Sequence, residues 1–253
     1  MKKILFIFFI LIIIAVFIAL NNNNPKVIIA KLIKKGNIGA GELRYRINFL
    51  GVLPVAEAII GVEKTQNYNG QKVYHLSASA KTLKSVSKIL SGEALLDSFV
   101  DIERLSPIAF KQRLRVSGKS DVDKEIIYDQ KQGIMSMGDV NRQIPAGTQD
   151  PLSAIFSLRQ MDFDKIKEFE MNINTNQKNY ILKGRAAPKE IIIEGKTYKT
   201  VILEASISRR DKNPYHKSRI KMVLLRGKEN TPILINVFAS GVLLNAQLID
   251  IKS

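Results

Sequence analysis

The sequence predicts a mainly β protein built on one large antiparallel sheet, and two observations support this fold class. From Gly41 onward, apolar and polar residues alternate with a period of two, as they do on strands with one buried face. Turn signals such as Asn69-Gly70 separate these runs closely, which predicts an antiparallel sheet of about a dozen strands. A flat sheet of that size would leave a long edge and an uncovered face, so the sheet must curl or close.

The N-terminal segment directs the chain to a membrane. Lys2 and Lys3 precede an unbroken apolar run over residues 4–20. Its length falls between the apolar region of a signal peptide and the about 20 residues of a membrane helix. Residues 1–24 are therefore expected to be a signal peptide or a membrane anchor with its linker. We prefer the uncleaved anchor, because cleavage after Ala19 would put bulky Phe17 where a small residue is needed.

The orientation of this segment is less clear from the charges alone. Lysines lie on both sides of the run, and the larger number on its C-terminal side mildly favours a body that faces inward. A short basic start, a long apolar run and a polar break over residues 21–25 instead resemble an export signal, and we favour export. Residues 25–40 are a basic lead-in. They either contact anionic lipid headgroups or, as we prefer, are simply solvated.

Residues 41–253 are expected to form one β-rich domain. The alternation is clear at residues 43–49, 74–80, 108–116 and 168–173, and later at 178–186, 190–194, 197–208, 218–226, 231–239 and 241–251. No internal repeat or second linker divides this stretch.

Two short helices interrupt the strands. Residues 83–90 have apolar side chains at helical spacing, and Gly92 follows as a stop signal. In residues 150–160, Asp150 is suited to the N-cap and Pro151 to the first helical position. Leu152, Ile155 and Phe156 then share one face, with Arg159 as a further candidate. A short helix of this kind can fill the open side of a curved sheet.

Residues 41–62, 72–82 and 145–159 resemble three stretches of the DUF3108 family of bacterial envelope proteins. In the first stretch the matching residues are Gly41, Glu42, Leu43, Tyr45, Gly51, Ala56 and Glu57. The third stretch is the most distinctive, and there Asp150, Pro151 and Leu152 open a helix. The resemblance implies an exported protein with a curved half-barrel or β-spiral, similar to lipoprotein carriers. It implies no reaction, since the activity of the family is unknown.

The composition excludes several kinds of chemistry. The chain has no cysteine, so a thiol nucleophile and thiolate metal sites are absent, and it has only two histidines, His75 and His216. His75 shares a polar strand face with Ser77 and Ser79, but no acidic residue that could orient it is evident nearby. Asp97 and Asp101 would lie about 13 Å apart on a strand, farther than paired glycosidase carboxylates at about 5–10 Å. We expect no catalytic residues, no metal and no cofactor.

The basic residues say more about possible binding partners than the histidines and acidic residues do. The chain has 39 Lys and Arg against 23 Asp and Glu, a net charge of +16. Lys111, Arg113 and Arg115 fall on one strand face, and Arg209 and Arg210 begin a basic loop that continues through Lys212 and Lys217. These groups are candidates for binding an anionic lipid, a glycan or an envelope protein. A lysine-rich composition alone is the other explanation. Nucleic acid is not expected, because the chain begins with a membrane-directing segment and has no RNA-binding strand motif.

Together these features predict a non-enzymatic exported protein, in the periplasm or at the outer face of the inner membrane. It would bind an amphiphilic envelope component or a partner protein. One alternative is a structural interaction module without a ligand pocket. A weaker alternative is an envelope hydrolase, which would need an acid, base or metal cluster that the sequence does not show. Asp150, Pro151 and Leu152 are interpreted as a structural helix start.

Overall fold

A computed structural model describes residues 41–63, 65–88, 91–193, 196–210, 218–227 and 229–252. The expected N-terminal anchor or signal peptide (residues 1–24), the basic lead-in (25–40) and the loop residues Lys212, His216 and Lys217 lie outside this part. Within it, no helix is both long and apolar enough to cross a membrane.

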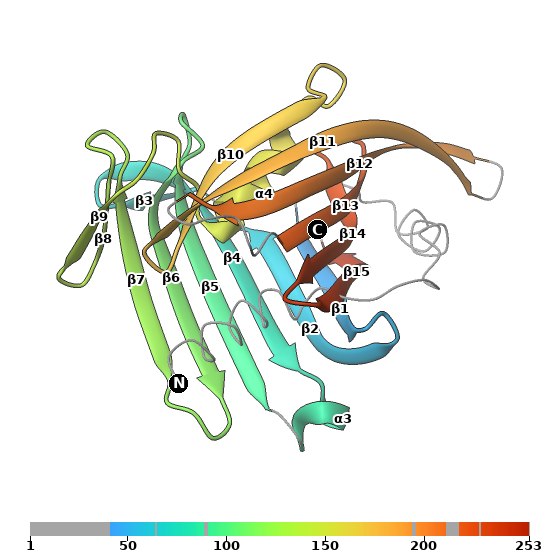
Figure 1. Cartoon of the computed structure of the whole chain (residues 1–253), viewed down its shortest axis with the longest axis horizontal. Helices are drawn as coiled ribbons and strands as arrows, with labels where there is room; N and C mark the ends of the chain where they lie inside the picture. The colour runs from blue at the N-terminus through green and yellow to red at the C-terminus, as the bar shows by residue number, and fades with distance from the viewer. Residues whose placement is uncertain are drawn as a thin grey trace.

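Fifteen antiparallel strands form one curved sheet around a helix (Figure 1). They are β1 (Glu42–Phe49), β2 (Leu53–Val62), β3 (Gln66–Tyr68), β4 (Gln71–Thr82), β5 (Gly92–Asp101), β6 (Pro107–Val116), β7 (Val122–Asp129), β8 (Ile134–Met137), β9 (Val140–Gln143), β10 (Glu168–Thr175), β11 (Lys178–Ile193), β12 (Lys196–Arg209), β13 (Ser218–Leu225), β14 (Thr231–Ala239) and β15 (Val242–Lys252). Their order is β10-β11-β12-β13-β14-β15-β1-β2-β4-β5-β6-β7-β8-β9, and β3 pairs with β4. The sheet does not close, and the mainly β prediction with one large curved antiparallel sheet is confirmed.

Irregularities in the strand pairing help the sheet to curl. The register shifts within the β1–β15, β1–β2, β5–β6 and β13–β14 pairs. At each such bulge, two residues of one strand lie opposite a single residue of its partner, which increases the local twist.

Strand β11 differs from the prediction, which split it into residues 178–186 and 190–194. The strand runs without a break through Pro188, opposite Val201 of β12. Pairing with β10 ends at Arg185, and the Ala186 N–H donates to the Lys167 carbonyl on the β10 side. Pro188 faces the same side two residues later, beyond the end of β10, where its missing N–H costs the ladder no hydrogen bond.

The two expected helices are present, but the first is shorter than predicted. Helix α3 spans Lys84–Ser87, a single turn with no buried residue and no capping side chain. A turn with so little packing gains little from a further turn, and Ile89 and Leu90 of the predicted helix lie outside the described residues. Helix α4 spans Pro151–Gln160 with Asp150 at its N-cap, as predicted.

Helix α4 packs against both halves of the curved sheet. Ala154 and Leu158 join a core cluster from β1, β2 and β10–β15. Leu152 and Phe156 join a second cluster from β4–β8, where the Phe156 ring lies 5.5 Å from that of Tyr74. The side chains of α4 therefore pack against the concave side of the sheet, and Figure 1 shows the helix on this inner side.

Candidate functional site

The first candidate site is the start of α4, where the family-like residues Asp150, Pro151 and Leu152 lie. The Asp150 side chain is fully buried, and its Oδ1 accepts hydrogen bonds from the N–H groups of Leu152 (2.7 Å) and Ser153 (3.0 Å). The Ser153 hydroxyl in turn accepts from the Asp150 N–H at 2.9 Å. This reciprocal capping box satisfies N–H groups that a helix start leaves without partners.

Burial also changes the acidity of this carboxyl. It raises the pKa of Asp150 to about 6, and hydrogen bonds from Ser98, Ser153 and Leu152 offset part of the rise. The neighbouring Tyr128 hydroxyl is buried too, and burial first, then the charge of Asp150, raise its pKa well above the usual value. Because these groups are sealed from solvent, no substrate can reach them in this conformation, and their contacts position the helix.

The residue before the cap joins distant parts of the sheet. The Gln149 N–H donates to the Asn172 carbonyl of β10, and the Asn174 N–H donates to the Gln149 carbonyl, both at 2.8 Å. The Gln149 side chain donates to the Leu105 carbonyl between β5 and β6 at 3.1 Å. The segment that enters α4 therefore connects edge strand β10 to the opposite half of the molecule.

Side chains bring the two edges of the open sheet together. The Asn179 amide on β11 donates to the Gln143 carbonyl on β9 at 2.8 Å. Lys124 of β7 donates to the Asn176 side chain in the β10–β11 turn at 2.6 Å. These bonds take the place of a β-ladder, so the sheet approaches a barrel without completing one.

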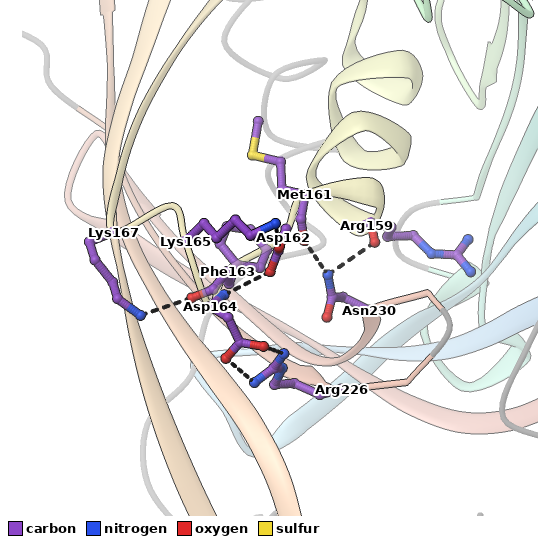
Figure 2. A network of polar contacts seen from close by, with 9 residues as sticks. All are labelled: Arg159, Met161, Asp162, Phe163, Asp164, Lys165, Lys167, Arg226 and Asn230. Atoms are coloured by element: carbon purple, nitrogen blue, oxygen red, sulfur yellow. Dashed lines mark hydrogen bonds and ion pairs between the residues drawn. The ribbon is translucent and has the colours of Figure 1, made fainter.

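The far end of α4 is held by the β13–β14 turn (Figure 2). The Asn230 side chain donates to the carbonyls of Arg159 (3.1 Å) and Met161 (2.9 Å), which satisfies acceptors at the helix end. Arg226 forms a two-pronged ion pair with Asp164 just beyond the helix. Both ends of α4 are therefore fixed to strands.

On the side of β2 and β4, little space remains beside the helix. A hollow of about 10 Å³ lies between α4 and strands β2 and β4, and its lining includes Leu76, Phe156 and Arg159. This volume suits about one water molecule, whereas ligand pockets typically measure about 300–1,000 Å³. Arg159 is only 3% exposed there, and its guanidinium pairs with Glu229 at 2.8 Å.

The structure places the three basic residues of β6 on the outer face, where carboxylates face each of them. Lys111 pairs with Glu125 at 3.2 Å, and Arg113 pairs with Asp123 at 3.1 Å. Arg115 contacts both Asp121 (2.8 Å) and Asp123 (3.1 Å). We call these three basic residues and their acidic partners the charge belt. An anion would compete with the acidic partners, so anion binding at the charge belt stays a prediction.

Of the other predicted basic residues, Arg209 ends strand β12 and Arg210 follows it, and β12 is not a neighbour of β6 in the sheet. Arg210 donates to the Asn172 side chain and lies 3.8 Å from Glu170 on β10. Sheet pairing therefore does not bring the two basic groups into one site.

His75 has acidic neighbours that the sequence did not reveal. Its Nδ1 lies 2.7 Å from Glu63 and its Nε2 lies 2.8 Å from Asp97. Both come near because β4 lies between β2 and β5 in the sheet. With a carboxylate at each ring nitrogen, neither nitrogen is left to accept a proton from Ser77, so the arrangement is not a catalytic triad.

Aromatic rings complete this outer cluster. The Phe99 ring stacks on His75 at 4.8 Å and on Tyr68 of β3 at 4.2 Å, and Lys111 lies 5.8 Å from the Tyr68 and Phe99 rings. The Tyr68 hydroxyl donates to Glu125 at 3.1 Å. The stack holds the short strand β3 against the outer face of the sheet.

The remaining acidic candidate has a structural role. After the bulge at Phe99, Asp101 accepts hydrogen bonds from the N–H groups of Glu103 and Arg104 and caps the β5–β6 turn. In the described part of the chain, no group of three or more His, Asp or Glu side chains is placed to hold a metal ion.

Comparison with known proteins settles the family. The sequence profile described as "Protein of unknown function (DUF3108)" matches residues 44–240, most of the chain. The chain belongs to the DUF3108 family. The matched region of this DUF3108 protein includes strands β2 to β14 and all of α4 with its buried cap.

A solved structure shares the fold of this DUF3108 protein. It is the crystal structure of a β-barrel-like protein of domain of unknown function DUF1849 from Brucella abortus, with a TM-score of 0.54. The likeness covers 84% of this chain and 97% of that one at 9% sequence identity, so it shows the fold alone. No curated protein matches the sequence.

Proposed function

We propose that this DUF3108 protein is a non-enzymatic interaction module of the bacterial envelope, which acts through its outer surface rather than through an internal ligand pocket. The observation behind this choice is the position of α4. Its side chains pack against both core clusters on the concave side of the sheet, and the hollow next to Leu76 and Phe156 measures only about 10 Å³. A lipid carrier of similar shape would need an interior many times larger.

The candidate groups for catalysis support a non-enzymatic role. Asp150 is buried and occupied as a helix cap. Both nitrogens of His75 face carboxylates, so this histidine is not a free base next to Ser77. The belt of Lys111, Arg113 and Arg115 with its acidic partners on β7 is an exposed surface of alternating charge, which suits a polar partner.

A photolabelling experiment tests the filled interior. The full chain is placed in vesicles that contain a lipid with a photoreactive acyl chain, and labelled residues are mapped after illumination. We expect no label on Leu76 or Phe156, because both side chains are buried between α4 and the sheet. Labelling of these residues at close to one lipid per chain would contradict the proposal and favour a carrier.

The location is part of the same proposal, and it depends on the N-terminal sequence. We propose that the body lies outside the inner membrane and that residues 4–20 hold it there. A C-terminal tag should be digested by protease in cells whose outer barrier has been opened. A tag that stays protected until the inner membrane is lysed would place the body in the cytoplasm and contradict export. The size of the undigested chain distinguishes an anchor from a cleaved signal.

A further inference from the structure

One hairpin tip exposes a contiguous apolar patch. Between β1 and β2, the side chains of Phe49 (37%), Leu50 (55%), Val52 (73%) and Leu53 (54%) are exposed. The other exposed large apolar side chains in the described residues, Ile127 and Ile192, lie singly on other strands. Scattered apolar residues are normal on a protein surface, whereas a contiguous patch is typical of an interaction site.

The backbone conformation at this tip is also unfavourable for the leucine that adopts it. Leu50 and Gly51 have φ angles of 50° and 81°, almost the same as Asn69 and Gly70 at 51° and 81° in the β3–β4 turn. Turns with two positive φ angles favour asparagine before glycine, and a leucine there is strained. Leu50 is therefore disfavoured both by its backbone and by its exposure to water. A role that needs an apolar side chain at the tip accounts for it.

Lysines lie beside the patch. At the same end of the sheet, Ala56 of β2 pairs with Thr82 of β4, and the Leu83 N–H donates to the Val55 carbonyl at 3.0 Å. This contact places helix α3 next to the hairpin. Lys81, Lys84 and Lys88, around α3, are all exposed, and Glu93 lies 3.9 Å from Lys81.

We propose that the β1–β2 hairpin tip, residues 49–53, inserts into the interface of an anionic lipid bilayer, with the lysines around α3 against the headgroups. Apolar side chains flanked by cations are the combination that interfacial binding requires. A convex tip suits a bilayer better than the groove or flat face of a protein partner.

The length of the chain before the sheet is compatible with this contact. The apolar run ends at Leu20, and the first strand begins at Glu42. Residues 21–40 can span up to about 70 Å when extended, and strand β1 is about 26 Å long at about 3.3 Å per residue. The tip can therefore reach the bilayer that holds residues 4–20. The inference rests on the proposed location, in which residues 4–20 hold the chain at a bilayer, but it does not depend on what fills the interior.

Single-cysteine labelling of the full chain tests the proposal, since the protein has no cysteine of its own. Val52→Cys is labelled with an environment-sensitive dye and placed in vesicles of phosphatidylcholine and phosphatidylglycerol. We expect a blue-shifted emission, several-fold weaker quenching by aqueous iodide, and quenching by a lipid-borne quencher. The matched control is Ile192→Cys, an apolar site of similar exposure (61%) on β11, which should stay accessible to iodide.

Charge and apolar variants make the test specific. Lys84→Gln with Lys88→Gln should lower the ratio of inserted to free tip by about fivefold per lysine, whereas Lys72→Gln with Lys189→Gln should not. If the dye at position 52 is as accessible to iodide as the dye at position 192 in the vesicles of phosphatidylcholine and phosphatidylglycerol, the proposal is overturned. A tip that crosslinks to a protein in cells but stays in water on vesicles would also overturn it, in favour of a protein-docking site.

Discussion

The Ser98 hydroxyl on β5 donates a 2.5 Å hydrogen bond to the carboxylate of Asp150, the N-cap of α4, across 52 residues of sequence. Both side chains are fully buried. The bond fixes the start of the helix to strand β5, while Asn230 fixes its end to the β13–β14 turn. The helix is therefore held at both ends on the concave side of the sheet.

Removing the cap should destabilise the fold. At pH 5, Asp150→Ala is expected to lower the free energy of unfolding by about 2–4 kcal/mol, since it removes an N-cap and leaves the buried Ser98 hydroxyl without its partner. Urea unfolding of the full chain in mild detergent measures this change. Asp162→Ala is the matched control, because Asp162 caps an exposed turn and should cost much less. An equal loss for both variants would contradict a special role for Asp150.

The pH dependence of stability should reveal the buried carboxyl. Its pKa is raised from 3.8 to about 6 in the folded state, so the folded chain binds more protons between these values. Stability therefore falls as pH rises from about 4 to about 6, by on the order of 3 kcal/mol from this group. Asp150→Asn keeps the capping acceptor but cannot ionise, so the variant should lose this decline. Unfolding curves from pH 4 to 8 for both proteins measure the difference, and parallel curves would refute the assignment.

Much of the fold could be predicted from local sequence. Alternation over residues 43–49 and 108–116 identified strands, and Asn69-Gly70 identified a hairpin, because both signals arise from neighbouring residues. Asp150 and Pro151 marked the start of α4 for the same reason. The continuity of β11 through Pro188 was missed, since it depends on where β10 ends rather than on β11 itself.

The candidate sites were less predictable, because they depend on contacts between distant strands. The register of β6 with β7 places Glu125 opposite Lys111, and the alternation of β6 alone could not show this. Glu63 and Asp97 reach His75 from the two strands that flank β4. The apolar tip could have been noticed, since Gly51 and Pro54 mark a turn between two strands and the residues of this turn are apolar, whereas turn residues are usually polar.

The charge belt makes a prediction about anions. Asp123 contacts both Arg113 and Arg115, and the hydrogen bond from Arg115 is the main cause that lowers the pKa of Asp123. Asp123→Asn should free Arg113, leave Arg115 paired only with Asp121, and strengthen binding to immobilised heparin, seen as elution at higher salt. Asp129→Asn makes the same charge change at a turn cap and is the control. Equal shifts for both variants would show that net charge alone decides binding.

Leu50→Asn should have opposite effects on stability and on membrane contact. Asparagine tolerates the positive φ of this turn, so the variant is expected to gain about 0.5–1 kcal/mol of unfolding free energy in detergent-free bicelles or mild detergent. The same substitution removes an apolar side chain from the tip and should reduce insertion of a dye at position 52. Ile192→Asn, an exposed apolar site on a strand, is the control and should change insertion little. A variant that is less stable would show that Leu50 packs within the fold, whereas greater stability with weaker insertion is expected only if the leucine is kept for contact outside the chain.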